Sequence, residues 1–393
     1  MSPRKSNRTG IKSLLFFPEE LIIQLLSYLP VKSLMQFKCV SKSWNTLISD
    51  PKFIKLHLQQ FKNNSNVKQI LCMSLRSYIL PFHLDTLLNN PSIINSTEDY
   101  FPSNPDYRYA FIGSCNGLIC FLLTLYPQKT QKTWFQLWNP ATNTLSNKFG
   151  EHSHGRNFIM VSGFSFGYDN STDTYKIVYL HSWKLEIFSF HGRKIIQLPH
   201  MVPFRYWDCV PYKRKFLSEG VYLNGTINFL VQEILNASID FFFREIIAEQ
   251  IVIISLNLAT DAYSKFLPPQ DFVEVSLHLP TIHVLGDSLY FSHHSQKTHF
   301  IMWKMMEFGI ENSWTQFLKI SYQDLDIHIE YKYFLAPLCL CESGIALVQG
   351  AKDVELQVIV YNWSENKIEK TRMHKQTKWM FNQNYVESLV PTS

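Results

Sequence analysis

The sequence predicts an α+β chain of two domains: a small unit of three helices, followed by an all-β propeller of about six or seven blades. The chain has 393 residues, too many for one ordinary core. Helical periodicity dominates the first 60 residues, and short apolar and aromatic runs between turn residues follow, with the stretch Ile234–Ile251 open to either interpretation. Charged residues make up only 18% and aromatic residues 15%, which favours β-sheet. We expect a disordered basic tail at residues 1–12, the helical unit at 13–60 and the propeller at 61–393.

The first helix is predicted to begin at Pro18, because proline suits the first helical position. Two glutamates follow in the first turn, where they face the positive end of the helix dipole. Pro30 ends the helix, since the residue before a proline avoids the helical conformation. Between the prolines, apolar residues recur every four positions: Leu21, Leu25 and Leu29.

A second short helix is predicted over about residues 32–39. Ser41 is a candidate N-cap for a third helix, which carries Trp44, Leu47 and Ile48. The pair Asp50-Pro51 then restarts the helical pattern as a cap and a first residue.

The helical unit carries more apolar surface than three short helices can bury. Domains of about 40 residues seldom fold alone without disulfides, metals or a partner. The unit contains a single cysteine, Cys39, so it cannot form an internal disulfide. We therefore expect the helices to dock either on the rest of the chain or on another protein, and the sequence leaves both open.

The helical unit resembles the F-box. The matching segments are Phe17-Pro-Glu-Glu-Leu21, the stretch from Ile23 to Leu34 with its Leu-Pro and Lys-Ser-Leu motifs, and Val40-Ser-Lys-Ser-Trp44-Asn-Thr-Leu-Ile48. The resemblance implies that the unit binds a Skp-family adaptor and through it a cullin. The expected anchors are Leu21, Leu25, Leu29 and Leu34, with Pro18 and Pro30 fixing the helix ends and Val40, Trp44 and Leu47 behind them.

The second part of the chain contains a repeated element, a glycine-bearing turn followed by an apolar strand. The glycines are 50, 58, 61 and 58 residues apart: Gly117, Gly167, Gly225, Gly286 and Gly344. A second element, a strand running into a polar turn, recurs at Asn139, Asn257 and Asn362. A period of 50–60 residues in strand-rich sequence is typical of kelch-like blades. A pair of all-β sandwiches is the alternative.

This part also resembles the F-box-associated domain of the large plant F-box family. The matching segments are Gly113–Phe121, Leu137–Thr142, Phe166–Asp169 with Tyr175–Val178, and Val221–Gly225. The resemblance implies a non-catalytic, kelch-like propeller that binds a target protein for ubiquitination.

Two chemical motifs offer other interpretations. Gly113-Ser-Cys115-Asn-Gly117 fits the cysteine form of a nucleophile elbow, but an elbow needs a following helix, and here a hairpin turn and a strand follow. His293, His294 and His299 could indicate a metal site, but their spacing matches no metal motif, and we expect solvated loops. We predict no cofactor.

We therefore predict a substrate-recognition subunit of a Skp–cullin–F-box ubiquitin ligase. A ligase-independent propeller scaffold is the alternative, followed by a cysteine hydrolase using Cys115. A net charge of +5 is too small to indicate nucleic acid, and the sequence has no apolar run of membrane-spanning length. We expect the protein in the cytoplasm or nucleus. The target is expected to bind variable loops such as Met201–Ser218 and Asp261–Pro280.

Overall fold

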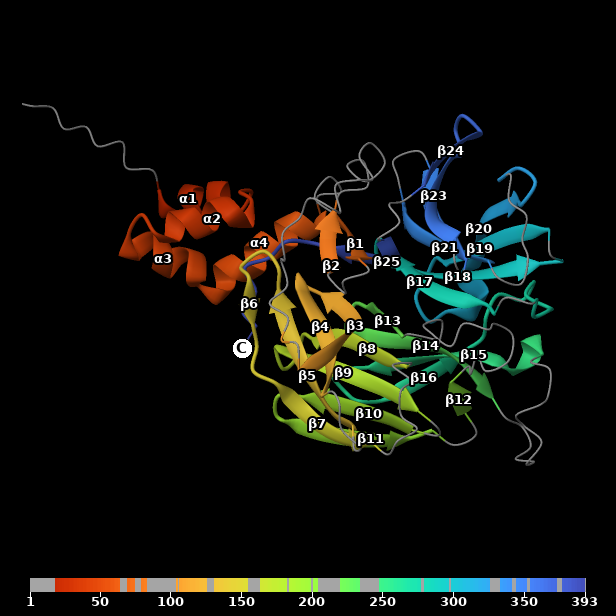
Figure 1. The fold of residues 1–393 in the computed structure, drawn as a ribbon, viewed down its shortest axis with the longest axis horizontal. Coiled ribbons are helices and arrows are strands. Elements are labelled where there is room, and N and C mark those ends of the chain that lie inside the picture. Colours follow the sequence, from red (N-terminus) through yellow and green to blue (C-terminus); the bar gives the residue numbers. More distant parts are fainter. Residues whose placement is uncertain are drawn as a thin grey trace, which may run out of the picture.

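A computed structural model shows a group of N-terminal helices beside a ring of β-sheets (Figure 1). The predicted tail at 1–12 and most of the loop at 201–218 lie outside the described residues, and the proposed domain limits remain a prediction. The structure describes residues 18–63, 69–74, 79–82, 104, 106–125, 131–154, 163–181, 184–198, 201–203, 220–233, 247–276, 279–296, 298–325, 333–340, 344–351, 354–372 and 377–392.

The helical unit has four helices instead of the predicted three. The fourth is separate because Pro51 has no amide hydrogen with which to continue the preceding helix. Asp50 caps it, since Asp50 Oδ1 accepts hydrogen bonds from the amides of Lys52 (2.7 Å) and Phe53 (3.3 Å). The helices are α1 (Glu19–Leu26), α2 (Val31–Lys38), α3 (Lys42–Ser49) and α4 (Pro51–Asn63).

Five sheets of four or five described strands form complete blades, all with antiparallel pairing. Blade 1 contains β3 (Tyr107–Cys115), β4 (Leu118–Leu125), β5 (Gln131–Asn139), β6 (Thr144–Leu145) and β7 (Phe149–His154). Blade 2 contains β8 (Phe164–Asp169), β9 (Thr174–His181), β10 (Lys184–Ser189) and β11 (Gly192–Gln197). Blade 3 contains β12 (Met201–Pro203), β13 (Val221–Leu223), β14 (Thr226–Glu233), β15 (Ile251–Asn257) and β16 (Tyr263–Phe266).

The last two complete blades have four strands each. Blade 4 contains β17 (Thr281–Leu285), β18 (Ser288–Ser295), β19 (His299–Met305) and β20 (Trp314–Ser321). Blade 5 contains β21 (Tyr333–Leu340), β22 (Gly344–Ala351), β23 (Val354–Asn362) and β24 (Lys367–Arg372). Two short 3₁₀ helices, η4 (Ala248–Gln250) and η5 (Glu311–Ser313), lie in blades 3 and 4.

A sheet with three described strands lies between blade 5 and blade 1. It joins β1 (Gln69–Ser74) and β2 (Ile79–Phe82) to β25 (Thr377–Tyr385), with Gln69 paired to Tyr385. The inner strands β3, β8, β13, β17, β21 and β25 contact one another in sequence around a ring, which excludes two β-sandwiches. The prediction of six or seven blades is wrong: the described residues form five complete blades. It assumed about 50 residues a blade, whereas the observed repeats are longer.

The glycine repeat is confirmed at three of its five positions. Gly117 (φ +80°), Gly225 (φ +85°) and Gly286 (φ +61°) occupy tight turns in the left-handed region that favours glycine. Gly167 does not, since it lies inside β8. Gly344 begins β22, and the residues before it lie outside the described part of the chain.

The asparagine repeat has a common hydrogen-bonding role. In each copy the side-chain oxygen of the last strand residue accepts amide hydrogen bonds from the following turn. Asn257 Oδ1, for example, accepts from the amides of Ala259 (2.9 Å) and Thr260 (3.1 Å). Asn139 and Asn362 do the same in blades 1 and 5. Asp169 at the end of β8 is a further copy that the sequence analysis missed, because an aspartate replaces the asparagine.

Replacing Asn257 by alanine is expected to lower the free energy of unfolding by about 1–2 kcal/mol, because two turn amides lose their acceptor. Asn257→Asp should be nearly neutral, since Asp169 already fills the equivalent position. Urea unfolding of the two variants checks this prediction. Equal stability of Asn257→Ala and the unmodified protein would contradict it.

The expectation that the histidines lie in solvated loops is wrong for His293 and His294. Both are on β18, with exposed fractions of 4% and 5%. Alternate side chains of β18 face opposite sides of blade 4, and neighbouring structure covers both sides. The ring of His293 packs edge-on against Phe272, and His294 Nδ1 hydrogen-bonds to the Tyr322 hydroxyl. His299 is the first residue of β19 and is half-buried.

Candidate functional site

The helical unit has its own small hydrophobic core. Leu34 and Ile48 are fully buried in it, and Trp44 packs at its edge, where its ring meets Phe37 in a T-shaped contact (centroids 5.1 Å apart). The buried members of this cluster are Leu26, Val31, Leu34, Ile48, Phe53 and Leu389. Leu389 comes from the far end of the chain, so the core of the helical unit is completed by a residue from beyond the propeller.

Four large apolar side chains on the same unit remain exposed. Leu21 and Leu25 lie four residues apart on α1, so they share one face of that helix. Tyr28 follows in the turn after α1, and Val40 lies in the turn between α2 and α3. Their exposed fractions are 47% for Leu21, 65% for Leu25, 58% for Tyr28 and 67% for Val40. We call these four residues the apolar surface. Sequence reasoning missed Tyr28, which lies outside the four-residue spacing.

The structure divides the residues predicted to bind the adaptor into two groups. Leu21, Leu25 and Val40 belong to the apolar surface. Leu34 is fully buried, while Leu29, Trp44 and Leu47 are half-buried against the core. Pro18 and Pro30 are exposed and occupy the N-cap positions of α1 and α2. Pro18 was expected to be the first helical residue, and it lies one residue before the helix begins. Helix α1 ends at Leu26, so Leu29 lies in the turn that follows.

A buried histidine holds the turn after α1 in place. His57 Nε2 on α4 donates to the carbonyl oxygen of Leu29 (2.9 Å), and its ring stacks on Phe61 with centroids 4.3 Å apart. Burial lowers the pKa of His57, with the hydrogen bond to Leu29 opposing this shift. Helix α4 therefore supports the segment from which Tyr28 projects.

The helical unit also docks on the propeller. Ala141, in the turn between β5 and β6, packs against the same core as Leu389. Lys55 on α4 forms an ion pair with Asp173 in the β8–β9 turn (2.9 Å), although both side chains are largely exposed and such a pair contributes little. The sequence left open whether the helices dock on the rest of the chain or on another protein. The structure shows docking on the rest of the chain, and this docking leaves the apolar surface exposed to solvent.

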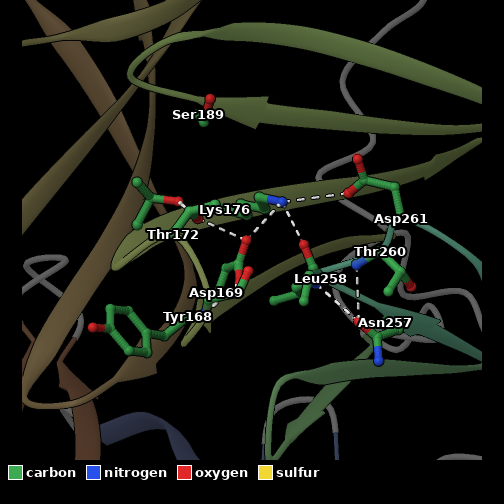
Figure 2. Close-up of polar contacts among 12 residues, drawn as sticks. Tyr168, Asp169, Thr172, Lys176, Ser189, Asn257, Leu258, Thr260 and Asp261 are labelled. Carbon is green, nitrogen blue, oxygen red and sulfur yellow. Dashed lines mark hydrogen bonds and ion pairs between the residues drawn. The ribbon is translucent and has the colours of Figure 1, made fainter.

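A polar network joins blades 2 and 3 near this junction (Figure 2). Lys176 Nζ lies 3.0 Å from Asp169 Oδ2 and 3.3 Å from Asp261 Oδ1, and it also donates to the carbonyl oxygen of Leu258. Burial alone raises the pKa of Asp169, but hydrogen bonds from Ser171, Thr172 and Lys176 outweigh it and hold that pKa below its usual value. The network fixes the β8–β9 turn, which carries the partner of Lys55.

The structure does not support a cysteine nucleophile at position 115. Cys115 ends β3, and Asn116-Gly117 form a hairpin turn into β4, where an elbow would need a helix. Burial raises the pKa of the Cys115 thiol to about 12, so the thiol stays protonated at neutral pH. Within the part of the chain that the structure describes, no three His, Cys, Asp or Glu side chains gather as metal ligands. None of the described helices combines the length and hydrophobicity needed to cross a membrane.

Comparison with known proteins identifies the helical segment. Residues 14–56 match the F-box domain family. An F-box/kelch-repeat protein of Arabidopsis thaliana is 27% identical over 359 residues, which cover 89% of this chain and 88% of that protein. Another Arabidopsis protein, provisionally named as F-box/kelch-repeat, is 28% identical over 220 residues, or 53% of this chain and 51% of that protein.

Similarity to solved structures is weak. Oligogalacturonate lyase in complex with manganese aligns with 10% identity and a TM-score of 0.34, covering 68% of this chain and 72% of that chain. The F-box match and the ring of sheets together show an N-terminal F-box domain followed by a propeller. The relatives of the chain include Arabidopsis F-box/kelch-repeat proteins.

Proposed function

We propose that this chain is the substrate-recognition subunit of a Skp–cullin–F-box ubiquitin ligase. An F-box domain implies binding to a Skp-family adaptor, and the F-box/kelch relatives support a substrate-adaptor role. The observation that carries the proposal is the apolar surface. It lies within the segment that matches the F-box, and it stays exposed although the same unit is already docked on the propeller.

The adaptor is proposed to cover the apolar surface. Leu21, Leu25 and Val40 would contact it directly, while Leu34 would act through the fold of the unit because its side chain is fully buried. Pro18 and Pro30 start α1 and α2 and so set the directions of the two helices. Leu29, Trp44 and Leu47 pack between the core and the surface.

The propeller is proposed to hold the target protein. In this role the chain performs no chemistry itself and raises the effective concentration of the target near the activated ubiquitin. Candidate contacts lie in the segment after β16, where Leu267 and Val273 are exposed with fractions of 47% and 73%. The loop predicted over Asp261–Pro280 is interrupted, because Tyr263–Phe266 form β16 in blade 3. A role in the cytoplasm or nucleus is part of the same proposal.

Reconstitution with a purified Skp-family adaptor tests this function. The full chain and the adaptor are mixed and separated by size-exclusion chromatography, and we expect one co-eluting complex. This complex should also retain a purified cullin when one is added. Separate elution of chain and adaptor would reject the ligase subunit and favour the ligase-independent scaffold.

A further inference from the structure

The seven described residues after β25, Val386–Thr392, run from the propeller to the helical unit (Figure 1). We call this segment the C-terminal strap. It leaves β25 beside the start of β1, because Tyr385 pairs with Gln69. Four of its residues are buried, with exposed fractions of 5% for Val386, 0% for Ser388, 5% for Leu389 and 6% for Thr392. A segment outside the sheets that is this deeply buried is held in place by tertiary contacts.

Two turns of blade 1 hold the strap through hydrogen bonds. Ser388 Oγ donates to the carbonyl oxygen of Asn116 in the β3–β4 turn (2.7 Å). Asn139 Nδ2 donates to the carbonyl oxygens of Ser388 (3.0 Å) and Val390 (2.8 Å). Asn139 therefore has two tasks: its oxygen caps the β5–β6 turn while its amide nitrogen binds the strap.

The next residue along the strap reaches the helices. Leu389 is buried in the core of the helical unit with Leu26, Val31 and Leu34. Two successive strap residues thus contact different domains: Ser388 binds the propeller, and Leu389 packs against the helices. The helical unit is also attached through the covalent connection between α4 and β1, the packing of Ala141 and the Lys55–Asp173 ion pair, and the strap adds a further attachment.

The close approach of the strap explains why position 117 requires a glycine. A side-chain methyl group at this position would lie 2.6 Å from the Val386 carbonyl oxygen and 2.7 Å from Ser388 Cβ, which is too close for any contact. Gly225 has almost the same φ in the equivalent turn of blade 3, but there the nearest atom would be 3.7 Å away. An alanine would have a strained backbone at both positions, but only at position 117 would it also collide with the strap.

We propose that the C-terminal strap, through Ser388 and Leu389, fixes the orientation of the helical unit on the propeller. Its consequence for ubiquitin transfer rests on the function proposed above. With the strap in place, the adaptor-bound ligase and the propeller-bound target keep one relative geometry, so ubiquitin reaches a narrow set of lysines. Leu389 and Ser388 are positioning residues in this arrangement.

Hydrogen exchange on the full chain without adaptor tests the attachment. Leu389→Ala is expected to increase exchange at least tenfold in the strap and in α4, with no change in blade 3, whereas Pro391→Ala, at an exposed strap position, should leave exchange unchanged. Gly117→Ala should release the strap, whereas Gly225→Ala should affect only its own turn. If Leu389→Ala also unfolds the helices, Gly117→Ala decides, because it leaves Leu389 intact. Equal strap exchange in Gly117→Ala and Gly225→Ala would overturn the proposal.

The positioning role is read out in a reconstituted ligase, with the lysines of the chain itself as the probe. Gly117→Ala is expected to bind adaptor as tightly as Gly225→Ala but to spread ubiquitin over more propeller lysines, as mapped by mass spectrometry. Identical lysine patterns in the two variants would overturn the positioning role. Failure of the unmodified chain to bind adaptor would reject the proposed function, while the exchange result would still decide whether the strap holds the helices.

Discussion

Replacing Leu21 and Leu25 together by alanine is expected to weaken adaptor binding by roughly 30- to 150-fold. Fully burying a leucine contributes about 1.5–3 kcal/mol. Because these two side chains are 47% and 65% exposed, an adaptor that covers them would gain about 2–3 kcal/mol from both together. At about 1.4 kcal/mol for each tenfold change, this corresponds to the stated loss. Titration calorimetry with purified Skp-family adaptor measures it.

The matched control is Gln24→Ala, which changes an exposed polar residue on the same helix and should leave affinity unchanged. Thermal unfolding of all variants should match that of the unmodified protein, because neither leucine belongs to the core. Leu34→Ala is unsuitable for this purpose, since it would empty the core of the helical unit. Full adaptor affinity of the Leu21→Ala/Leu25→Ala protein would show that the adaptor does not bind here.

Lowering the pH from about 7.5 to about 5 is expected to cost the propeller about 4 kcal/mol of stability through two buried histidines. Burial lowers the pKa of His283 to about 3, and burial likewise lowers the pKa of His293 to about 4, with nearby Glu274 opposing the second shift. His293 must be neutral to accept the hydrogen bond from Trp303 Nε1 (3.3 Å). His283 Nε2 interacts with the hydroxyls of Thr281 (2.7 Å) and Ser292 (3.2 Å).

The direction of the pH effect follows from proton uptake. Both folded pKa values lie below the unfolded value of 6.5, so the unfolded chain takes up protons first as the pH falls. Stability is therefore nearly full above about pH 6.5, and it is lost as the pH falls through the folded pKa values of about 4 for His293 and about 3 for His283. At about pH 5, roughly 1.5 units below the unfolded value, each histidine costs about 2 kcal/mol at 1.36 kcal/mol per unit.

Urea unfolding at several pH values, followed by tryptophan fluorescence, measures this loss. The His283→Gln/His293→Gln protein should lose much less stability over the same range, because glutamine retains hydrogen-bonding groups but does not titrate. The slope with pH is the relevant quantity, since the substitutions also change absolute stability. An unchanged slope in this variant would mean that other groups control the acid sensitivity.

The local elements of this protein were predictable because they depend on neighbouring residues. The cap at Asp50, the proline at the start of α1, and the Asn-Gly turns at Gly117 and Gly225 are all decided within a few positions. The sequence assigned Pro30 to the end of the first helix, whereas it is the N-cap of α2. The repeat of these turns was enough to predict a propeller. The number of complete blades could not be predicted, because the connections vary in length and the last sheet joins the first two strands, β1 and β2, to the last strand, β25.

Only the tertiary structure could show which of the predicted adaptor-binding residues are exposed and which are buried. Leu21 and Leu34 look equivalent in the sequence, yet one is 47% exposed and the other fully buried. The difference arises because Leu34 on α2 lies in the core with Leu26, Ile48 and Phe53 of the other three helices, while Leu21 on α1 lies outside that core. His293 shows the same limit, since its burial depends on the packing of neighbouring elements around β18.

The sequence by itself determined that a small helical unit precedes a repeated β-structure, because periodicity and turn residues act over short distances. Only the tertiary structure decided what completes that unit. Leu389 lies 355 positions after Leu34, and no local pattern relates two residues so far apart. Their contact exists because the ring of blades brings the end of β25 back to the start of β1, so that the last residues of the chain meet the first helices.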